Sequence, residues 1–193
     1  MHPEFETYLQ AQGSLPPNVI QRISDLAVQK TLRRNESILN TGEICRHKIF
    51  VLSGMLRTFT TSADGSEHIL LFSPEHNWTL DPASYDQQVP SRVSIGTVEP
   101  SDVLCWHKSN FDALLAEIPQ FRGFTNKLIS RNIYLNRERI LTTLSGTAEE
   151  KYDGFVRMFP NYLLRLPLRM IASYLGISLK TLTRIRHAQL QRH

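Results

Sequence analysis

Cysteine is scarce in this chain, where Cys45 and Cys105 are the only two among 193 residues. Two thiols cannot build a framework of several disulfides, and they are too few to hold an iron–sulfur cluster through four thiolates of one chain. No apolar run is long enough to span a bilayer, and residues 1–5 do not resemble a signal peptide. We therefore expect a cytoplasmic protein without a membrane partner.

Motifs of known enzyme chemistry are also missing. The sequence has no nucleophile elbow, no phosphate-binding loop and no HExxH metal motif. A metal-dependent enzyme built on a β-barrel would need His and Glu ligands together on its strands, and the chain contains no His-x-His pair. We therefore predict that the protein is not an enzyme and carries no cofactor.

Acidic residues are absent from the last forty positions. Residues 154–193 contain seven Lys and Arg but no Asp or Glu, whereas the whole chain has 22 basic and 18 acidic residues. The first 153 residues therefore hold 15 basic residues (22 minus 7) against 18 acidic ones, and all excess positive charge lies at the C-terminal end. Such a distribution is typical of a module that binds nucleic-acid phosphates.

The same C-terminal stretch has the pattern of two short helices joined by a tight turn. Pro167 suits the start of the first helix, and Gly176 can adopt the left-handed conformation that ends it. Ser178 is a good N-cap for the second helix, which carries Leu182 and Ile185 on one face. The pattern predicts a helix-turn-helix, whose second helix enters the major groove of DNA.

The residues predicted to contact DNA lie on these two helices. Lys180, Thr181 and Arg184 occupy the base-reading positions, and Arg184 suits a bidentate contact with guanine. The other predicted contacts are Ser178, Thr183, Arg169 and Arg186. Two alternatives stay open: an ordinary helical hairpin that ends a globular domain, and a small-molecule-sensing module that signals through protein contacts rather than specific DNA.

Short segments of strand pattern dominate the N-terminal part, after helices predicted at 3–11 and 18–27. Many short strands at close spacing favour a jelly roll of about eight strands. Residues 74–90 interrupt this rhythm and are predicted to form a long loop with a helical turn, a kind of segment that often binds ligands. The predicted strands are 28–33, 37–40, 47–53, 55–62, 66–73, 92–98 and 102–107.

Helical periodicity returns after residue 108. Ser109 is predicted to cap a helix over 110–117, and Pro119 to open a longer helix that ends near residue 144. The spacings of seven between Leu128 and Leu135 and between Ile133 and Ile140 suit a partner helix, with packing inside a single chain as the alternative. A further helix is predicted over 148–158.

These elements predict an α+β protein with three parts. The parts are an N-terminal β jelly-roll sensor domain (1–118), a dimerisation helix (119–145) and an all-α helix-turn-helix DNA-binding domain (146–193). The predicted partners are double-stranded DNA and a second copy of the chain, and the sequence leaves the existence of a small-molecule effector open.

The chain resembles the Crp/Fnr family of bacterial transcription regulators, particularly the short members found in Bacteroidetes-type bacteria. The resemblance rests on the run Lys48–Arg57 and, more specifically, on Ile171–Ile185. It implies a cyclic-nucleotide-binding-type jelly roll, a long dimer helix and a winged helix-turn-helix that reads a palindromic operator. Only residues 161–166 precede the first helix of the motif, so any wing must be very short.

The resemblance also locates a ligand site, at which this sequence departs from the family pattern. Members that bind a cyclic nucleotide carry a Gly-Glu pair and, ten residues on, an Arg for the phosphate. These positions correspond to Leu80-Asp81 and Ser91, with Arg92 one residue further. A shift by one residue turns a strand side chain to the opposite face. Without a guanidinium the phosphate charge stays uncompensated, so we predict that cyclic AMP does not bind tightly.

Two Cys-x-His pairs form another candidate cluster. Cys45 and His47, like Cys105 and His107, are two residues apart and share a face if they lie on strands, so two adjacent strands could form a tetrahedral zinc site. Buried thiols beside edge histidines are the commoner arrangement, and the usual CxxC spacing is missing. We therefore assign no metal site and leave open whether the four residues cluster.

Overall fold

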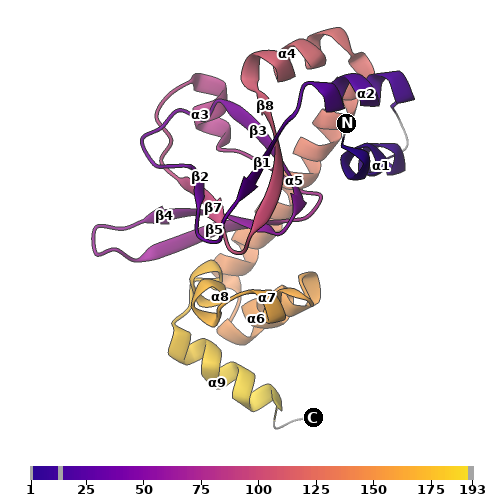
Figure 1. The fold of residues 1–193 in the computed structure, drawn as a ribbon. Helices are drawn as coiled ribbons and strands as arrows, with labels where there is room; N and C mark the ends of the chain where they lie inside the picture. Colours follow the sequence, from indigo (N-terminus) through magenta and orange to yellow (C-terminus); the bar gives the residue numbers. More distant parts are fainter. Residues whose placement is uncertain (1, 13–14, 191–193) are drawn as a thin grey trace. The chain divides into compact units, whose positions relative to one another are not determined.

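The computed structural model describes residues 2–12 and 15–190. The chain forms two compact units: one contains the residues up to 61 together with 70–128, and the other contains 62–69 and the residues from 129 onward. The architecture is the predicted α+β class, with a β jelly roll, a long helix and a set of C-terminal helices (Figure 1).

Two four-stranded antiparallel sheets form the jelly roll within the described residues. Each predicted strand is present, with ends that differ by at most two residues, and a short additional strand lies in the segment that was predicted to be a loop. The first sheet has the order β1 (Val28–Leu32), β8 (Ser101–His107), β3 (His47–Ser53) and β6 (Trp78–Thr79). The second has the order β2 (Ser37–Leu39), β7 (Ser94–Thr97), β4 (Met55–Thr61) and β5 (Glu67–Pro74).

The predicted loop at 74–90 is more structured than its sequence indicated. It contains the two-residue strand β6 and the helix α3 (Pro82–Gln87). Asp81 caps α3 by accepting a hydrogen bond from the backbone N–H of Ala83. The helix turn was predicted, but β6 was not, because two residues show no alternation of apolar and polar side chains.

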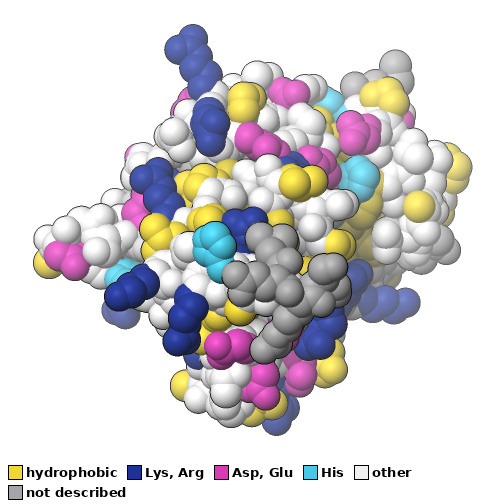
Figure 2. Space-filling view, turned by 90° about the horizontal axis from the view of Figure 1, so that it is seen from below, with side chains coloured by type: hydrophobic (Ala, Val, Ile, Leu, Met, Phe, Trp, Pro, Cys, Tyr) yellow, Lys and Arg dark blue, Asp and Glu magenta, His cyan; other side chains and the backbone are white. Residues whose placement is uncertain are grey.

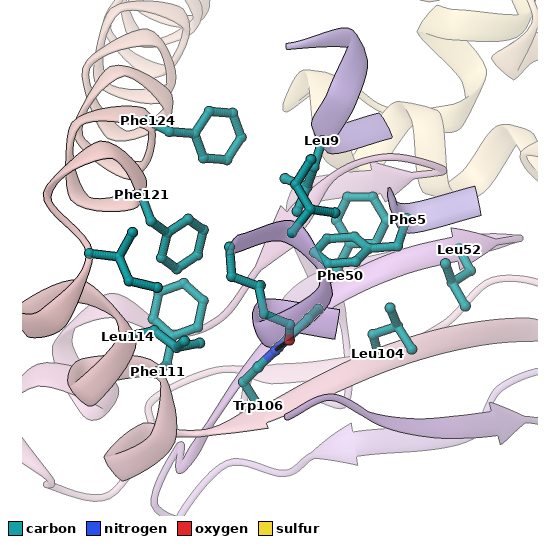
Figure 3. Packing of buried hydrophobic residues seen from close by; sticks show 13 residues of the cluster. Phe5, Leu9, Phe50, Leu52, Leu104, Trp106, Phe111, Leu114, Phe121 and Phe124 are labelled. Carbon is teal, nitrogen blue, oxygen red and sulfur yellow. Dashed lines mark hydrogen bonds between the residues drawn. The ribbon is translucent and has the colours of Figure 1, made fainter. Parts of the chain in front are cut away.

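Alternate residues on β3 and β8 face opposite ways, so the first sheet carries a core on each side. On the outer side, the sheet packs against α1 (Pro3–Ala11), α2 (Pro17–Asp25), α4 (Lys108–Glu117) and the start of α5 (Pro119–Ser145). Trp106 lies within this cluster, and its indole N–H donates to the carbonyl of Ile23 at 2.7 Å (Figure 3).

The predicted cap of α4 is corrected. The helix begins at Lys108, directly after β8, and the ring of His107 accepts a hydrogen bond from the backbone N–H of Ser109. Ser109 therefore lies in the first turn rather than at the cap, because the strand continues into the helix without a loop.

One glycine between strands is required by both its conformation and its surroundings. Gly54 joins β3 to β4 with a φ of +84°, and a Cβ atom there would lie 2.4 Å from the carbonyl oxygen of Pro100. Any side chain would therefore clash with backbone at this position. Gly54 lies in the run Lys48–Arg57, on which part of the family resemblance depends.

The second unit consists of the later part of α5, four shorter helices and residues 62–69. The shorter helices are α6 (Ala148–Met158), α7 (Tyr162–Arg165), α8 (Leu168–Leu175) and α9 (Leu179–Leu190). Thr147 and Glu150 form a reciprocal capping box at the start of α6. The wing that the family resemblance implied is not found before the motif, because the described residues between α6 and α8 include the helix α7 and contain no strand.

A hairpin turn of the jelly roll belongs to this second unit. Residues 62–66 join β4 to β5, and Ser173 of α8 bonds to the backbone at the start of β5. The Ser173 hydroxyl donates to the carbonyl of Glu67 at 2.7 Å and accepts from the N–H of Ile69 at 3.0 Å. No local sequence pattern predicts this contact, because the partners are more than 100 residues apart.

Candidate nucleic-acid interface and ligand pocket

The α8–α9 pair has the local geometry of a helix-turn-helix. Gly176 ends α8 in the left-handed conformation with a φ of +65°, as predicted. The Ser178 hydroxyl accepts from the backbone N–H of Thr181 at 3.0 Å, so it caps α9. Leu182 and Ile185 are 0% and 2% exposed, which fixes the buried face of α9 and turns the remaining positions outward.

The predicted base-reading residues share the outward side of α9. Lys180 and Arg184 are exposed, whereas Thr181 is half-buried. The hydroxyl of Thr183 donates to the carbonyl of Leu179 at 2.9 Å, which engages its only hydrogen within the helix. Among the other predicted contacts, Arg169 of α8 is exposed and Arg186 is half-buried.

An acidic residue lies near the predicted guanine reader. A carboxylate oxygen of Glu149, in α6, lies 3.9 Å from a guanidinium nitrogen of Arg184, and the two side chains are 59% and 74% exposed. An ion pair this exposed is weak, so Arg184 can exchange Glu149 for another acceptor at little cost in free energy. The contact of Glu149 with Arg184 was not predicted from the sequence, because the stretch without acidic residues begins five residues after Glu149.

Figure 2 shows the basic and acidic side chains of one face of the molecule. Lys and Arg side chains, drawn dark blue, are distributed among Asp and Glu side chains on that face. Within the second unit, Glu149 lies beside Arg184, and such an acid weakens long-range attraction to a polyanion. Contacts of individual side chains on α8 and α9 matter correspondingly more.

The positions that correspond to the family's nucleotide site meet in the jelly roll. Ser91 is 3% exposed, and its hydroxyl donates to Asp81 at 2.7 Å. The other carboxylate oxygen of Asp81 accepts from the N–H of Ala83, so both oxygens have partners inside the chain. Arg92 is exposed and precedes β7. The ten-residue spacing thus brings Asp81 and Ser91 together and leaves Arg92 at the surface.

The Cys-x-His pairs come together only in part. His47 and His107 are cross-strand partners of β3 and β8, and their ring centres are 5.5 Å apart. Cys45 and Cys105 are each 2% exposed, and they line one pocket with His47. Among residues 2–12 and 15–190 there is no group of three or more His, Cys, Asp or Glu that could hold a metal ion.

Burial dominates the titration behaviour of these groups. It raises the pKa of the Cys45 thiol and raises that of Cys105 to about 11, so both thiols are protonated at neutral pH. Burial also lowers the pKa of His47, and repulsion from Lys30, His107 and Arg46 lowers it further. The two thiols are therefore poor nucleophiles, and the surroundings of His47 are electropositive.

Comparison with known proteins agrees with this architecture. A family profile described as "Cyclic nucleotide-binding domain" matches residues 29–118. The chain is 23% identical over 186 residues to the electron transport regulator A of Shewanella oneidensis, covering 89% of this chain and 73% of that protein. It is 25% identical over 167 residues to the transcriptional activator protein FnrA of Stutzerimonas stutzeri, covering 81% and 68% respectively.

Solved structures extend the match to the C-terminal helices. The structure of FixK2 from Bradyrhizobium japonicum aligns with a TM-score of 0.76 at 17% identity, covering 86% of this chain and 85% of that chain. Residues 29–118 are therefore a cyclic nucleotide-binding domain, set in the fold of the Crp/Fnr regulators. The relatives that the chain matches are named as regulators. None of its described helices is long and apolar enough to cross a membrane.

Proposed function

We propose that this protein is a DNA-binding transcription regulator that acts in the cytoplasm as a homodimer on a palindromic operator. The observation that carries the proposal is the α8–α9 pair, in which a capped second helix has a buried apolar face and exposed Lys180 and Arg184. Helices of this kind enter the major groove and read base edges.

Distinct roles follow for the basic side chains. Lys180, Thr181 and Arg184 read bases, with Arg184 suited to the two acceptors of guanine. Arg169 and Arg186 contact phosphates, and these contacts give affinity that is independent of sequence and falls with salt. Ser178 and Thr183 remain predicted contacts, and Thr183 would have to release its hydrogen bond to Leu179 before its hydroxyl could donate to a phosphate. Family members of the commonest site preference carry an acid at the position of Lys180, so we expect the operator to differ there.

Exposed apolar residues on α5 support dimerisation. Seven large apolar side chains in the later part of the helix are between 39% and 82% exposed: Ile129, Ile133, Tyr134, Leu135, Ile140, Leu141 and Leu144. A helix that is apolar toward solvent over this length is typical of one that packs on a partner. Leu128 packs against the core of its own chain, so the partner face begins after it. The proposal keeps the division of the chain into a sensor domain (1–118), a dimerisation helix (119–145) and a DNA-binding domain (146–193).

The nucleotide pocket is degenerate in this proposal. Ser91 stands where the phosphate-binding Arg is expected, and Asp81 is already hydrogen-bonded to Ser91 and Ala83. A cyclic phosphate there would lack a cationic partner. We therefore expect no tight binding of cyclic AMP, and calorimetry that gave micromolar affinity would contradict this point.

Selection from random-sequence DNA followed by gel shift tests the function. We expect enrichment of an inverted repeat with half-sites about one helical turn apart. Salt-sensitive binding without an enriched sequence would contradict specific regulation and favour a sensing module that acts through protein contacts. The double variant Lys180→Ala/Arg184→Ala is the control, since it should abolish the selected sequence while nonspecific binding remains.

A further inference from the structure

A pocket of about 420 Å³ adjoins the residues that correspond to the nucleotide site, because the backbone N–H of Ser91 donates to the carbonyl of Glu43, a lining residue, at 2.8 Å. Asp81, Ser91 and Arg92 are not among the residues that line it. Its size is in the range of small-molecule pockets. The lining residues are Lys30, Ile38, Leu39, Glu43, Ile44, Cys45, Arg46, His47, Ile49 and Cys105.

The deeper part of the pocket is apolar. Leu39, Ile49 and both cysteines are between 2% and 5% exposed, and they belong to the core between the two sheets. The two thiols are protonated at neutral pH, so they behave here as small apolar groups. This part of the pocket therefore suits a hydrocarbon chain rather than a metal ion or an electrophile.

The mouth of the pocket carries two cations and one carboxylate, so its net charge is positive. Lys30 and Arg46 are exposed, and neither forms an ion pair within residues 2–12 and 15–190. Glu43 is the one acidic lining residue, and its carboxylate accepts from the backbone and side-chain N–H groups of Asn40. Glu43 thus has hydrogen-bond donors within its own turn but keeps its negative charge, and Lys30 and Arg46 outnumber it.

The pKa of His47 responds to the same charges at the mouth. Its pKa is lowered first by burial and then by repulsion from Lys30, His107 and Arg46. A neutral imidazole held among three cationic or basic neighbours marks a region of positive potential. An anionic group placed there would gain from all of these side chains.

We propose that this pocket binds a small aliphatic monocarboxylate, with its carboxylate between Lys30 and Arg46 and its hydrocarbon chain against Ile49 and the two cysteines. The proposal does not rest on DNA binding, because the complex is expected for the free protein.

Isothermal titration calorimetry of the full chain with octanoate tests the charge requirement. Octanoate is expected to bind with one site per chain, and Arg46→Glu should weaken it by about tenfold or more, since a favourable charge pair becomes repulsive. Arg92→Glu makes the same change of charge on an exposed residue outside the pocket, and it should leave the affinity within about twofold. Octylamine should not bind, because its ammonium group meets Lys30 and Arg46.

Thiol labelling of the unaltered protein tests the location. Cys45 and Cys105 are the only thiols of the chain, and both line the pocket. Saturating octanoate should therefore slow their reaction with a disulfide reagent, whereas octylamine should not. The proposal is overturned if octanoate does not bind, if Arg46→Glu and Arg92→Glu weaken it equally, or if bound octanoate leaves the labelling rate unchanged.

Discussion

Arg184 combines exposure, a planar donor pair and a weak attachment to Glu149. Replacing it by alanine should reduce binding to the selected operator by about 1–3 kcal/mol and relax the preference at one base position. Arg169→Ala should instead weaken operator and random DNA equally, because a phosphate contact carries no sequence information. Competition gel shifts with both DNAs measure the two effects, and equal losses for both variants would contradict the role of Arg184.

His47 should make the jelly roll less stable as the pH falls. Its folded-state pKa lies below the unfolded value of about 6.5, so the unfolded chain binds more protons as the pH falls. The stabilisation from neutral His47 is therefore complete above that pH and is lost progressively below it. Chemical denaturation of His47→Gln should show a smaller decline in the free energy of unfolding between neutral pH and pH 5 than the unaltered protein. An unchanged slope would show that His47 is not the group responsible.

At the scale of elements, the segments before and after β3 provide a matched pair of glycines. Gly54 and Gly42 both have positive φ, but only Gly54 faces backbone atoms at clashing distance, whereas Gly42 faces open space. Gly42→Ala should cost about 1–2 kcal/mol from the left-handed conformation alone. Gly54→Ala should cost clearly more, because Pro100 and Ser101 must also move. Thermal unfolding of both variants measures the difference, and equal melting temperatures would contradict a steric role for Pro100.

Elements with a long repeating pattern could be predicted from sequence, and elements defined by tertiary contacts could not. Helix α5 begins at Pro119 and ends at Ser145, close to the predicted range, because its apolar positions recur over 27 residues. The strand β6 was missed because its two residues are ordered only by pairing with Ile49 and Phe50 of β3. Helix α7 was missed because four residues give less than two turns of pattern.

The candidate sites divide in the same way. The outward face of α9 follows from local rules, since a cap at Ser178 and two apolar residues set its orientation. The meeting of Asp81 with Ser91 followed from the family pattern rather than from composition. The pocket lined by Cys45 and Cys105 depends on how β1, β2, β3, β8 and the segment before β3 come together. The sequence shows only the two Cys-x-His pairs.

At the scale of the whole molecule, the apolar face of α5 predicts the oligomeric state. Ile140 is 60% exposed, and Ile140→Glu should shift the protein from dimer to monomer, because a charge would be buried in the partner contact. Analytical ultracentrifugation measures the shift. Leu164 is 91% exposed on α7, so Leu164→Glu is the control that should leave the dimer intact. A monomeric unaltered protein at working concentrations would contradict the dimer itself.

The contact of Ser173 with residues 62–69 has a consequence for dividing the molecule. The chain passes from one compact unit to the other at residues 61–62, 69–70 and 128–129. A fragment that starts at residue 129 would lack the backbone acceptor at Glu67 and the donor at Ile69 that Ser173 binds. Transferring α8 and α9 alone to another protein would therefore remove both hydrogen bonds of Ser173. A chimera that grafts the helix-turn-helix onto another sensor should need this hairpin turn transplanted with it.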